Sequence, residues 1–221
     1  MRIDAIVPAH NEAPTIGGVV TVLQSAPSVA RVLVVDDGST DGTDQVALRA
    51  GAAVIRAEKN AGKGRAMRAG LSATTAPFVG FFDADLLSLR VEHVESLVAT
   101  AARGYGMVCG LRDRGILNPW QLVMPIITGE RVCARSFLER VPMTCWSGYS
   151  IETAMNDAAR RQGVPVALIW LDQLSIRDKT AKVGFWKGLG RHATMFAEIM
   201  KTARTLEKSC GTTCDPTRAT V

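Results

Sequence analysis

The chain has 221 residues, 47% of them hydrophobic, and a formal net charge of +5 at pH 7. This length and apolar content suffice for one large α/β domain with its own core. No apolar run reaches the roughly 18 residues of a membrane-spanning helix, so we expect none.

The positive charge favours anionic partners: nucleotide phosphates, nucleic acid or an acidic membrane surface. Nucleic acid is disfavoured because the basic residues are dispersed and no aromatic-basic motif accompanies them. The first residues enter a strand-like run without a charged leader or an apolar signal core, so we expect a cytoplasmic protein. The five cysteines are scattered and form no Cys-x-x-Cys pair, which argues against a disulfide framework and a zinc site.

Short apolar runs alternate with segments of helical spacing along the first half of the chain. Strands are predicted at residues 3–7, 31–35, 52–55, 77–82 and 107–109. Helices are predicted at residues 13–24, 40–50, 62–71 and 89–102. This alternation predicts an α/β fold with a mostly parallel sheet and helices on both faces. Ligands of such sheets bind at the carboxyl ends of the strands, so the polar residues that follow the strands should share one rim.

Two carboxylates one residue apart, Asp83 and Asp85, follow the predicted strand 77–82. Carboxylates in this place can converge on a hard divalent cation, Mg²⁺ or Mn²⁺, which leaves coordination positions for substrate phosphates. The alternative is that the two residues only end the strand or cap the next helix.

Three more polar clusters stand where strands end or helices begin. Pro8 to Glu12 and Asp36 to Ser39 form two turns, in which Asp36 or Asp37 can accept a hydrogen bond from a base or a ribose hydroxyl. Asn60 to Gly64 places a lysine between glycines at the start of a helix, a pattern that suits an anion. Ordinary turns are the alternative for the first two clusters.

Taken together, four motifs in this order resemble those of family 2 glycosyltransferases with the GT-A fold. They are Pro8-Ala9-His10-Asn11-Glu12, Asp36-Asp37-Gly38-Ser39, Asn60-Ala61-Gly62-Lys63-Gly64 and Asp83-Ala84-Asp85. The resemblance is dense over about residues 3–110. Beyond them it thins to Thr128-Gly129-Glu130-Arg131 and Gly148 to Thr153, which are similar to bacterial members that make glycolipid or polyprenyl-phosphate sugars. Such members often carry a polar residue where this chain has Leu87.

The resemblance implies metal-dependent, inverting transfer of a sugar from a UDP- or GDP-type donor to an acceptor hydroxyl or phosphate, which is possibly lipid-linked. It places the metal on Asp85, with Asp83 on the metal or the ribose. Arginines beside the loop after the metal-binding strand can clamp phosphates. The predicted nucleotide-sugar contacts are Pro8, His10, Asn11, Glu12, Asp36, Asp37, Gly38, Asn60, Gly62, Lys63, Asp83, Ala84, Arg112 and Arg131.

Transfer to a hydroxyl also needs a base, which the family usually places at the start of a helix in the acceptor half. Glu152 begins the predicted helix 151–161 and is the candidate, beside Asp85 as the other catalytic residue. The alternative is a glutamate that the helix dipole favours in the first turn. Asp157 is a second candidate, and an acceptor phosphate would need no base.

We therefore divide the chain into a nucleotide-sugar-binding half, residues 1–110, and an acceptor half of the same domain, residues 111–181, with a late strand at 164–171. Residues 182–208 predict a basic amphipathic helix. It packs on its own domain, on a partner chain in a homodimer, or on the inner face of the membrane. For residues 209–221 we expect disorder.

Two other functions stay open at this point. A nucleotidyltransferase would share the sheet and the metal, but it would carry a glycine-rich basic loop in place of Pro8 to Glu12. A non-catalytic module would bind nucleotides without turnover. The sugar, the base of the nucleotide and the acceptor are not encoded in any of these motifs.

Overall fold

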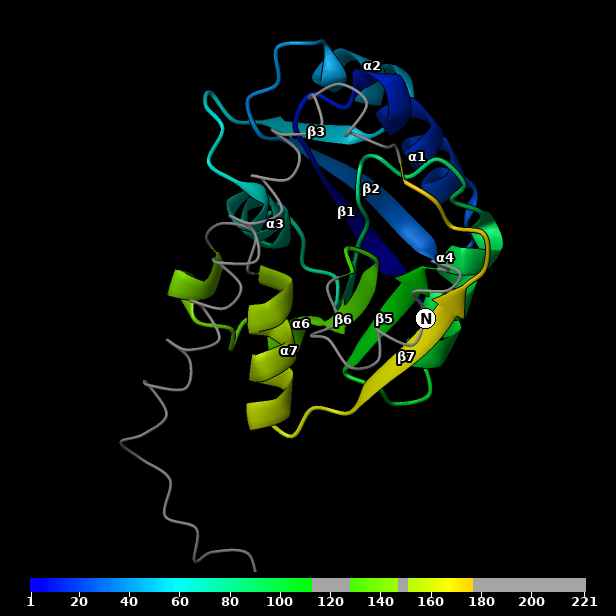
Figure 1. Ribbon diagram of the computed structural model, residues 1–221, viewed down its shortest axis with the longest axis vertical. Coiled ribbons are helices and arrows are strands. Elements are labelled where there is room, and N and C mark those ends of the chain that lie inside the picture. Colours follow the sequence, from blue (N-terminus) through cyan, green and yellow to red (C-terminus); the bar gives the residue numbers. More distant parts are fainter. Residues whose placement is uncertain (113–127, 147–150, 177–221) are drawn as a thin grey trace, which may run out of the picture. The chain divides into compact units, whose positions relative to one another are not determined.

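The computed structural model describes residues 1–112, 128–146 and 151–176 (Figure 1). These residues belong to one compact unit, Met1–Asp178. The predicted amphipathic helix 182–208 and the predicted disordered tail 209–221 lie outside the described residues. No helix of the described part is long and apolar enough to cross a membrane.

The first half of the chain alternates strands and helices as its apolar pattern predicts. The strands are β1 (Ile3–Ala9), β2 (Val29–Asp36), β3 (Ala53–Arg56), β4 (Phe78–Phe81) and β5 (Met107–Arg112). The helices are α1 (Ala13–Ser25), α2 (Thr43–Arg49), α3 (Lys63–Ser72) and α4 (Val91–Ala101). Every strand and helix predicted before residue 112 is confirmed, with bounds shifted by a few residues.

The second half holds elements that the sequence pattern did not predict. They are β6 (Arg131–Ala134), the short helix α6 (Arg135–Leu138) and the 3-10 helix η2 (Met143–Trp146). The predicted helix α7 (Ile151–Arg161) and the predicted late strand β7 (Val166–Leu171) are present. β6 escaped prediction because it has only four residues and begins with an arginine.

The strands form one sheet of seven in the order β3-β2-β1-β4-β6-β5-β7. All neighbours are parallel except β6, which runs antiparallel to both β4 and β5. The mostly parallel sheet is thus confirmed, and the unpredicted strand stands between the metal-motif strand β4 and β5.

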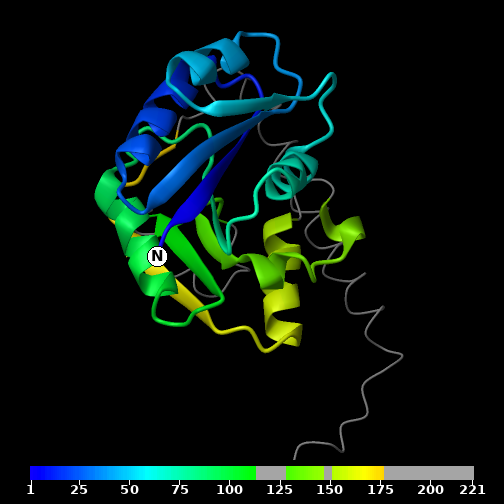
Figure 2. The same ribbon diagram turned by 180° about the vertical axis from the view of Figure 1, so that it is seen from behind.

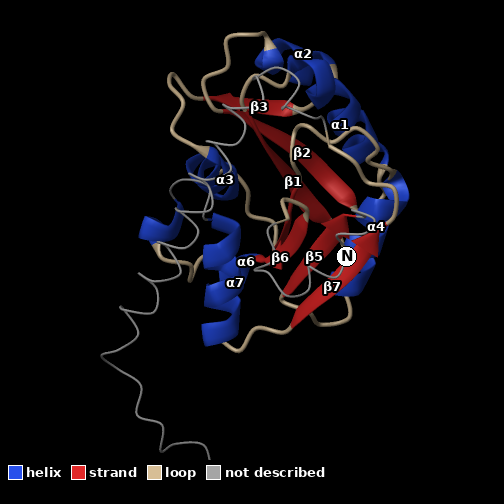
Figure 3. Ribbon diagram, viewed as in Figure 1, coloured by secondary structure: helices blue, strands red, loops and turns tan. Residues whose placement is uncertain are grey.

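Helices cover both faces of the sheet, as Figures 2 and 3 show. On one face Ile16 of α1 and Leu97 of α4 are fully buried, and on the other face Met67 of α3, Phe137 of α6 and Met155 of α7 are buried. Burial on both faces explains why the central strands are apolar throughout.

The carboxyl ends of β1, β2 and β4 lie side by side because these strands are parallel and adjacent. Ala9, the last residue of β1, pairs with Asp36, the last residue of β2. Ile6 of β1 pairs with Phe81, the last residue of β4. The turns after these strands therefore meet on one rim, as ligand sites of such sheets do.

Candidate active site

The turns after β1 and β2 are joined by hydrogen bonds into one surface. His10 Nδ1 lies 2.9 Å from the backbone oxygen of Asp37. The Asn11 backbone N–H donates to Ser39 Oγ at 2.9 Å, and the Thr40 N–H donates to Asn11 Oδ1 at 2.9 Å. His10 and Asn11 are exposed, so the joined turns present these two side chains outward.

The two aspartates at the end of β2, Asp36 and Asp37, point into the protein. Asp36 is fully buried, and its Oδ1 accepts from the Ser39 N–H at 3.0 Å. Asp37 accepts from the backbone N–H groups of Ala61 at 2.8 Å and Gly62 at 2.7 Å. Asp37 thus connects the loop of residues 60–64 to the end of β2. Both aspartates stabilise the turns of the rim through hydrogen bonds to backbone N–H groups.

Gly38 lets these two segments approach each other. It has φ +73°, and a Cβ there would lie 2.8 Å from the backbone nitrogen of Asn60. A side chain would require the loop to move, which explains the glycine. Asn60 is exposed beside it, so the sequence-predicted contacts Gly38 and Asn60 do reach the same rim.

Lys63, the first residue of α3, contacts two carboxylates that are far apart in the sequence. Its Nζ lies 2.7 Å from Asp83 Oδ1 and 2.6 Å from Glu152 Oε1. Glu152 stands in the first turn of α7 and is buried. One lysine therefore holds the metal-motif aspartate and the predicted base together.

Arg112 contacts Asp83 from the other side. Its Nη2 lies 2.7 Å from Asp83 Oδ2 and 2.7 Å from Glu130 Oε1, while its Nε donates to Glu130 Oε2 at 2.9 Å. Thr128 Oγ1 also donates to Glu130 Oε2, at 2.8 Å. The two carboxylates thereby fix the guanidinium group of Arg112 beside Asp83.

These ion pairs set the charges of the cluster. Burial by itself would raise the pKa of Asp83, but the charges of Lys63 and Arg112 outweigh it and lower that pKa well below its usual value. Burial would likewise lower the pKa of Lys63, and the charges of Asp83 and Glu152 raise it instead. Asp83 is thus a carboxylate and Lys63 an ammonium ion at any physiological pH.

Asp85 is the carboxylate that the sequence predicts as the metal ligand. It is half-buried in the turn after β4, and the two oxygens of the neighbouring Asp83 contact Lys63 and Arg112. No group of three or more His, Cys, Asp or Glu able to hold a metal occurs within the described ranges. One carboxylate completed by substrate phosphates and water is an arrangement that Mg²⁺ accepts.

Arg131 does not come to the rim. Its side chain is fully buried, and its Nε donates to the Thr128 backbone oxygen at 2.8 Å. Its Nη1 donates to Asn156 Oδ1 at 2.7 Å and to the Glu152 backbone oxygen at 3.3 Å. The structure therefore assigns it to positioning α7, in contrast to the predicted phosphate clamp.

Three further predicted contacts, Pro8, Glu12 and Ala84, are buried. The backbone N–H of Glu12 donates to Thr43 Oγ1 at 2.9 Å, which fixes the start of α1. For Pro8 and Ala84 any ligand contact would be through the backbone.

Sequence reasoning assigned no role to Gly129 and Glu130. A Cβ on Gly129 would lie 2.2 Å from Asp83 Oδ1, so only glycine lets this turn pass over the aspartate. Glu130 is fully buried beneath Arg112. The signal was the tetrapeptide Thr128-Gly129-Glu130-Arg131, which stood out by resemblance but suggested no chemistry.

Comparison with known proteins agrees with this geometry. The profile of a family described as Glycosyl transferase family 2 matches residues 4–156. An uncharacterized glycosyltransferase of Mycobacterium tuberculosis is 38% identical over 120 residues, which are 53% of this chain and 53% of that protein. The chain thus spans about half the length of this relative.

Two further matches concern one enzyme. Glucosyl-3-phosphoglycerate synthase of Mycolicibacterium smegmatis is 35% identical over 190 residues, covering 69% of this chain and 62% of that protein. A crystal structure of the Mycobacterium tuberculosis synthase with Mn²⁺, UDP and glucosyl-3-phosphoglycerate superposes with a TM-score of 0.77. It is 25% identical and covers 97% of this chain and 81% of that one.

Proposed function

Since this chain belongs to glycosyl transferase family 2, we propose that it transfers a sugar from a nucleoside-diphosphate sugar to an acceptor hydroxyl or phosphate, with inversion at the anomeric carbon. The observation that supports this most is the convergence of Asp83 and Glu152 on Lys63. It brings the aspartate of the donor motif and the predicted base to one lysine, so a donor and an acceptor bound at these carboxylates would lie close together.

The donor nucleotide would bind across the joined turns after β1 and β2. His10, Asn11 and Asn60 are exposed there, and their side chains suit a base or a ribose. Asp37 holds the loop beneath them through two backbone hydrogen bonds, so this surface exists before the ligand arrives. The UDP of the similar synthase structure supports a uridine nucleotide.

Lys63 and Arg112 would neutralise the diphosphate as it leaves. Both bind Asp83 here, at 2.7 Å, and each brings a positive charge to the rim. Preorganised charges of this kind stabilise a departing anion. A divalent metal held by Asp85, with Asp83 beside it, would add Lewis-acid stabilisation of the same leaving group.

Glu152 would take the proton of an acceptor hydroxyl. The hydrogen bond from Lys63 Nζ to Oε1, at 2.6 Å, orients the carboxylate. Arg131 holds the backbone oxygen of Glu152 and the side chain of Asn156, so the start of α7 is fixed. A base held in this way is poised for general-base catalysis.

A donor panel tests the proposal without an identified acceptor. UDP-, GDP- and dTDP-sugars are incubated with the protein and Mg²⁺ or Mn²⁺, and release of the nucleoside diphosphate is measured with and without EDTA. Slow metal-dependent hydrolysis of one donor is expected. Binding without turnover would identify a non-catalytic module, and pyrophosphate release from a nucleoside triphosphate with a sugar phosphate would identify a nucleotidyltransferase.

A further inference from the structure

The loop that carries the metal motif is joined to a second loop by hydrogen bonds. We call residues 82–90, between β4 and α4, the motif loop, and residues 172–176, after β7, the distal loop. The Leu87 backbone N–H donates to the Ser175 backbone oxygen at 3.0 Å. The hydroxyl groups of Ser88 and Ser175 lie 2.6 Å apart, although 87 positions separate the two residues. The motif loop is therefore held in place by a segment that is remote in the sequence.

Arg90, the last residue of the motif loop, reaches the distal loop with its side chain. Its Nη1 donates to Gln173 Oε1 at 3.2 Å, and its Nη2 donates to the Asp172 backbone oxygen at 3.1 Å. Arg90 is also the N-cap residue of α4, so it links the distal loop to the start of that helix. All three residues are exposed, and water competes for such bonds.

His93, in the first turn of α4, contacts the same carbonyl from inside the protein. Its side chain is buried, and its Nε2 lies 2.9 Å from the Asp172 backbone oxygen. Its Nδ1 lies 3.3 Å from the Arg90 backbone nitrogen. A carbonyl oxygen only accepts and a backbone N–H only donates, so Nε2 must carry the proton and Nδ1 must be unprotonated. The two contacts therefore require one tautomer of the neutral imidazole.

A second proton on the ring would break this arrangement. An Nδ1–H would face the Arg90 backbone N–H, and the ring would become a cation with its Nε2 3.2 Å from Arg90 Nη2. The other charges that act on the ring are those of Glu92 on α4 and Asp172 in the distal loop. Burial, together with the charge of Arg90, lowers the pKa of His93 against these two carboxylates and the bond to the Asp172 carbonyl. The ring is therefore neutral at neutral pH.

We propose that His93 and Arg90 form a proton-sensitive latch, in which the neutral imidazole holds the motif loop on the distal loop and protonation releases it. Leu86, Leu89 and Leu174 are buried in the core beneath the two loops, so the release is a local opening and leaves the fold intact. An effect of the latch on donor binding rests on the proposed function, because the motif loop would hold the metal there. The latch itself stands on the contacts of the two loops.

Amide hydrogen exchange of Leu87 measures the latch in the full chain. Exchange is followed by NMR at about pH 7.5 and about pH 4.5, on either side of the histidine range, and each rate is divided by the intrinsic rate at that pH. The protection factor of Leu87 should fall about tenfold at the lower pH, as the loss of one or two hydrogen bonds gives. That of Phe82, whose N–H donates to the Ile6 oxygen at 3.1 Å, should stay constant.

His93→Gln tests the proton dependence. Glutamine at this position of a helix can still accept from the N-cap N–H but does not titrate. Protection of Leu87 in this variant should therefore be the same at both pH values. A loss of protection at low pH that persists in His93→Gln would overturn the proposal, as would equal protection of Leu87 at both pH values in the wild type.

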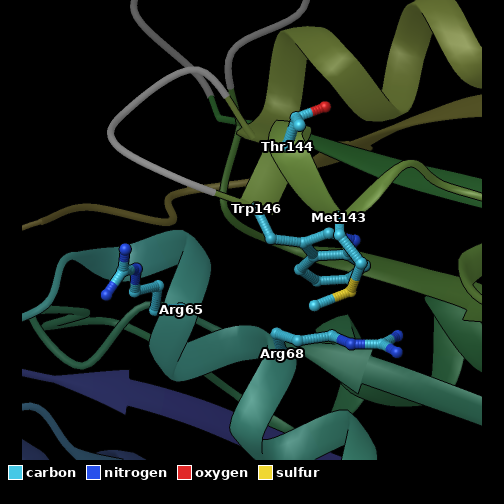
Figure 4. A pocket seen from close by; sticks show the side chains of 5 residues that line it. All are labelled: Arg65, Arg68, Met143, Thr144 and Trp146. Atoms are coloured by element: carbon cyan, nitrogen blue, oxygen red, sulfur yellow. The ribbon is translucent and has the colours of Figure 1, made fainter.

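Arg68 supplies a matched control for Arg90. Its Cζ lies 5.6 Å from the centroid of the Trp146 ring, so it too is an arginine beside an aromatic ring (Figure 4). It stands on α3, which covers the other face of the sheet. Arg90→Ala should lower the protection of Leu87 about tenfold already at neutral pH, and Arg90→Lys should restore part of it. Arg68→Ala should behave as the wild type does, and Arg90→Ala with wild-type protection would refute the latch.

The ¹⁵N chemical shifts of the His93 ring decide the tautomer without any variant. The Nε2–H tautomer is expected at neutral pH, and a charged ring or the Nδ1–H tautomer there would overturn the proposal. In a second arm, affinity for the sugar nucleotide that turns over in the donor panel should fall with Leu87 protection in the wild type and not in His93→Gln. Constant affinity would refute the link to the donor. If no sugar nucleotide binds, the proposed function fails, and the exchange rates still decide the latch.

Discussion

The donor rim, made by the turns after β1 and β2, and the ion-pair cluster around Asp83 are built in different ways. In the donor rim, backbone groups supply much of the bonding, as in the two N–H bonds to Asp37. In the cluster, charged side chains bond across wide sequence separations, such as the 89 positions between Lys63 and Glu152. The donor rim is therefore set by strand register, and the cluster by the place of β6 within the sheet and by the packing of α7 on it.

This difference predicts different responses to substitution. The donor rim should tolerate changes of exposed side chains, because backbone hydrogen bonds hold its shape. The cluster should respond strongly to single changes, because removing one member of a buried ion pair leaves another charge without its partner.

The largest effect is expected from Asp85→Asn, which removes the carboxylate proposed to hold the metal. Turnover of the donor should fall by about 1000-fold, the scale of a lost electrostatic contact to a leaving group, while the melting temperature stays close to that of the wild type. Hydrolysis of the sugar nucleotide at saturating Mn²⁺ measures it. The exposed Glu92→Gln on α4 is the matched control. Full activity of Asp85→Asn in EDTA would refute the metal assignment.

Glu152→Gln should slow transfer to a hydroxyl acceptor by about 100-fold, the usual scale for loss of a general base. Nucleotide affinity should barely change, because Glu152 lies on α7 and not on the turns that would hold the nucleotide. Initial rates and a UDP titration separate the two quantities. Asp157→Asn, on the same helix and the other candidate base, should transfer normally. A collapse of UDP affinity in Glu152→Gln would reassign this residue to the donor rim.

Gly129→Ala tests the close approach to Asp83. The new methyl group would meet a carboxylate that two cations hold in place, so the free energy of unfolding should fall by about 2 kcal/mol. Gly18→Ala in α1 meets nothing within 4 Å and should stabilise slightly. Urea unfolding of both variants gives the comparison. Equal stability of Gly129→Ala and wild type would show that the side chains around Asp83 can move to accept a methyl group, and would contradict the prediction that the cluster responds strongly to single changes.

The smallest effect concerns pH. The pKa of Asp83 is lowered in the folded protein, so its contribution is present above the unfolded value of about 3.9 and is lost as pH falls through the folded value. The pKa of Lys63 is raised, so its contribution is present below about 10.4 and is lost as pH rises through the folded value.

The stability difference between wild type and Asp83→Asn should therefore be flat from about pH 5 to 9 and shrink by about 1 kcal/mol below pH 4. Chemical unfolding at a series of pH values measures it. A difference that grows as the pH falls would have the opposite sign and would contradict the ion pairs of Asp83.

The sequence predicted more of the donor rim than of the ion-pair cluster. The strands and helices up to residue 112 were predicted because each has its own apolar period and its own polar ending, as at Asp36 and Asp83. The sequence also identified Glu152 at the start of a helix. It did not predict β6, and it assigned Arg131 to phosphate binding, whereas the structure buries that side chain.

The sequence by itself thus determined the α/β alternation, the family and the residues of the rim, because these depend on patterns within about ten positions. Only the tertiary structure decided which charges meet: that Lys63 joins Asp83 to Glu152, and that Glu130 fixes Arg112. Ion pairs form between side chains that the packing of the sheet brings within 3 Å, and no local pattern along the chain encodes that distance.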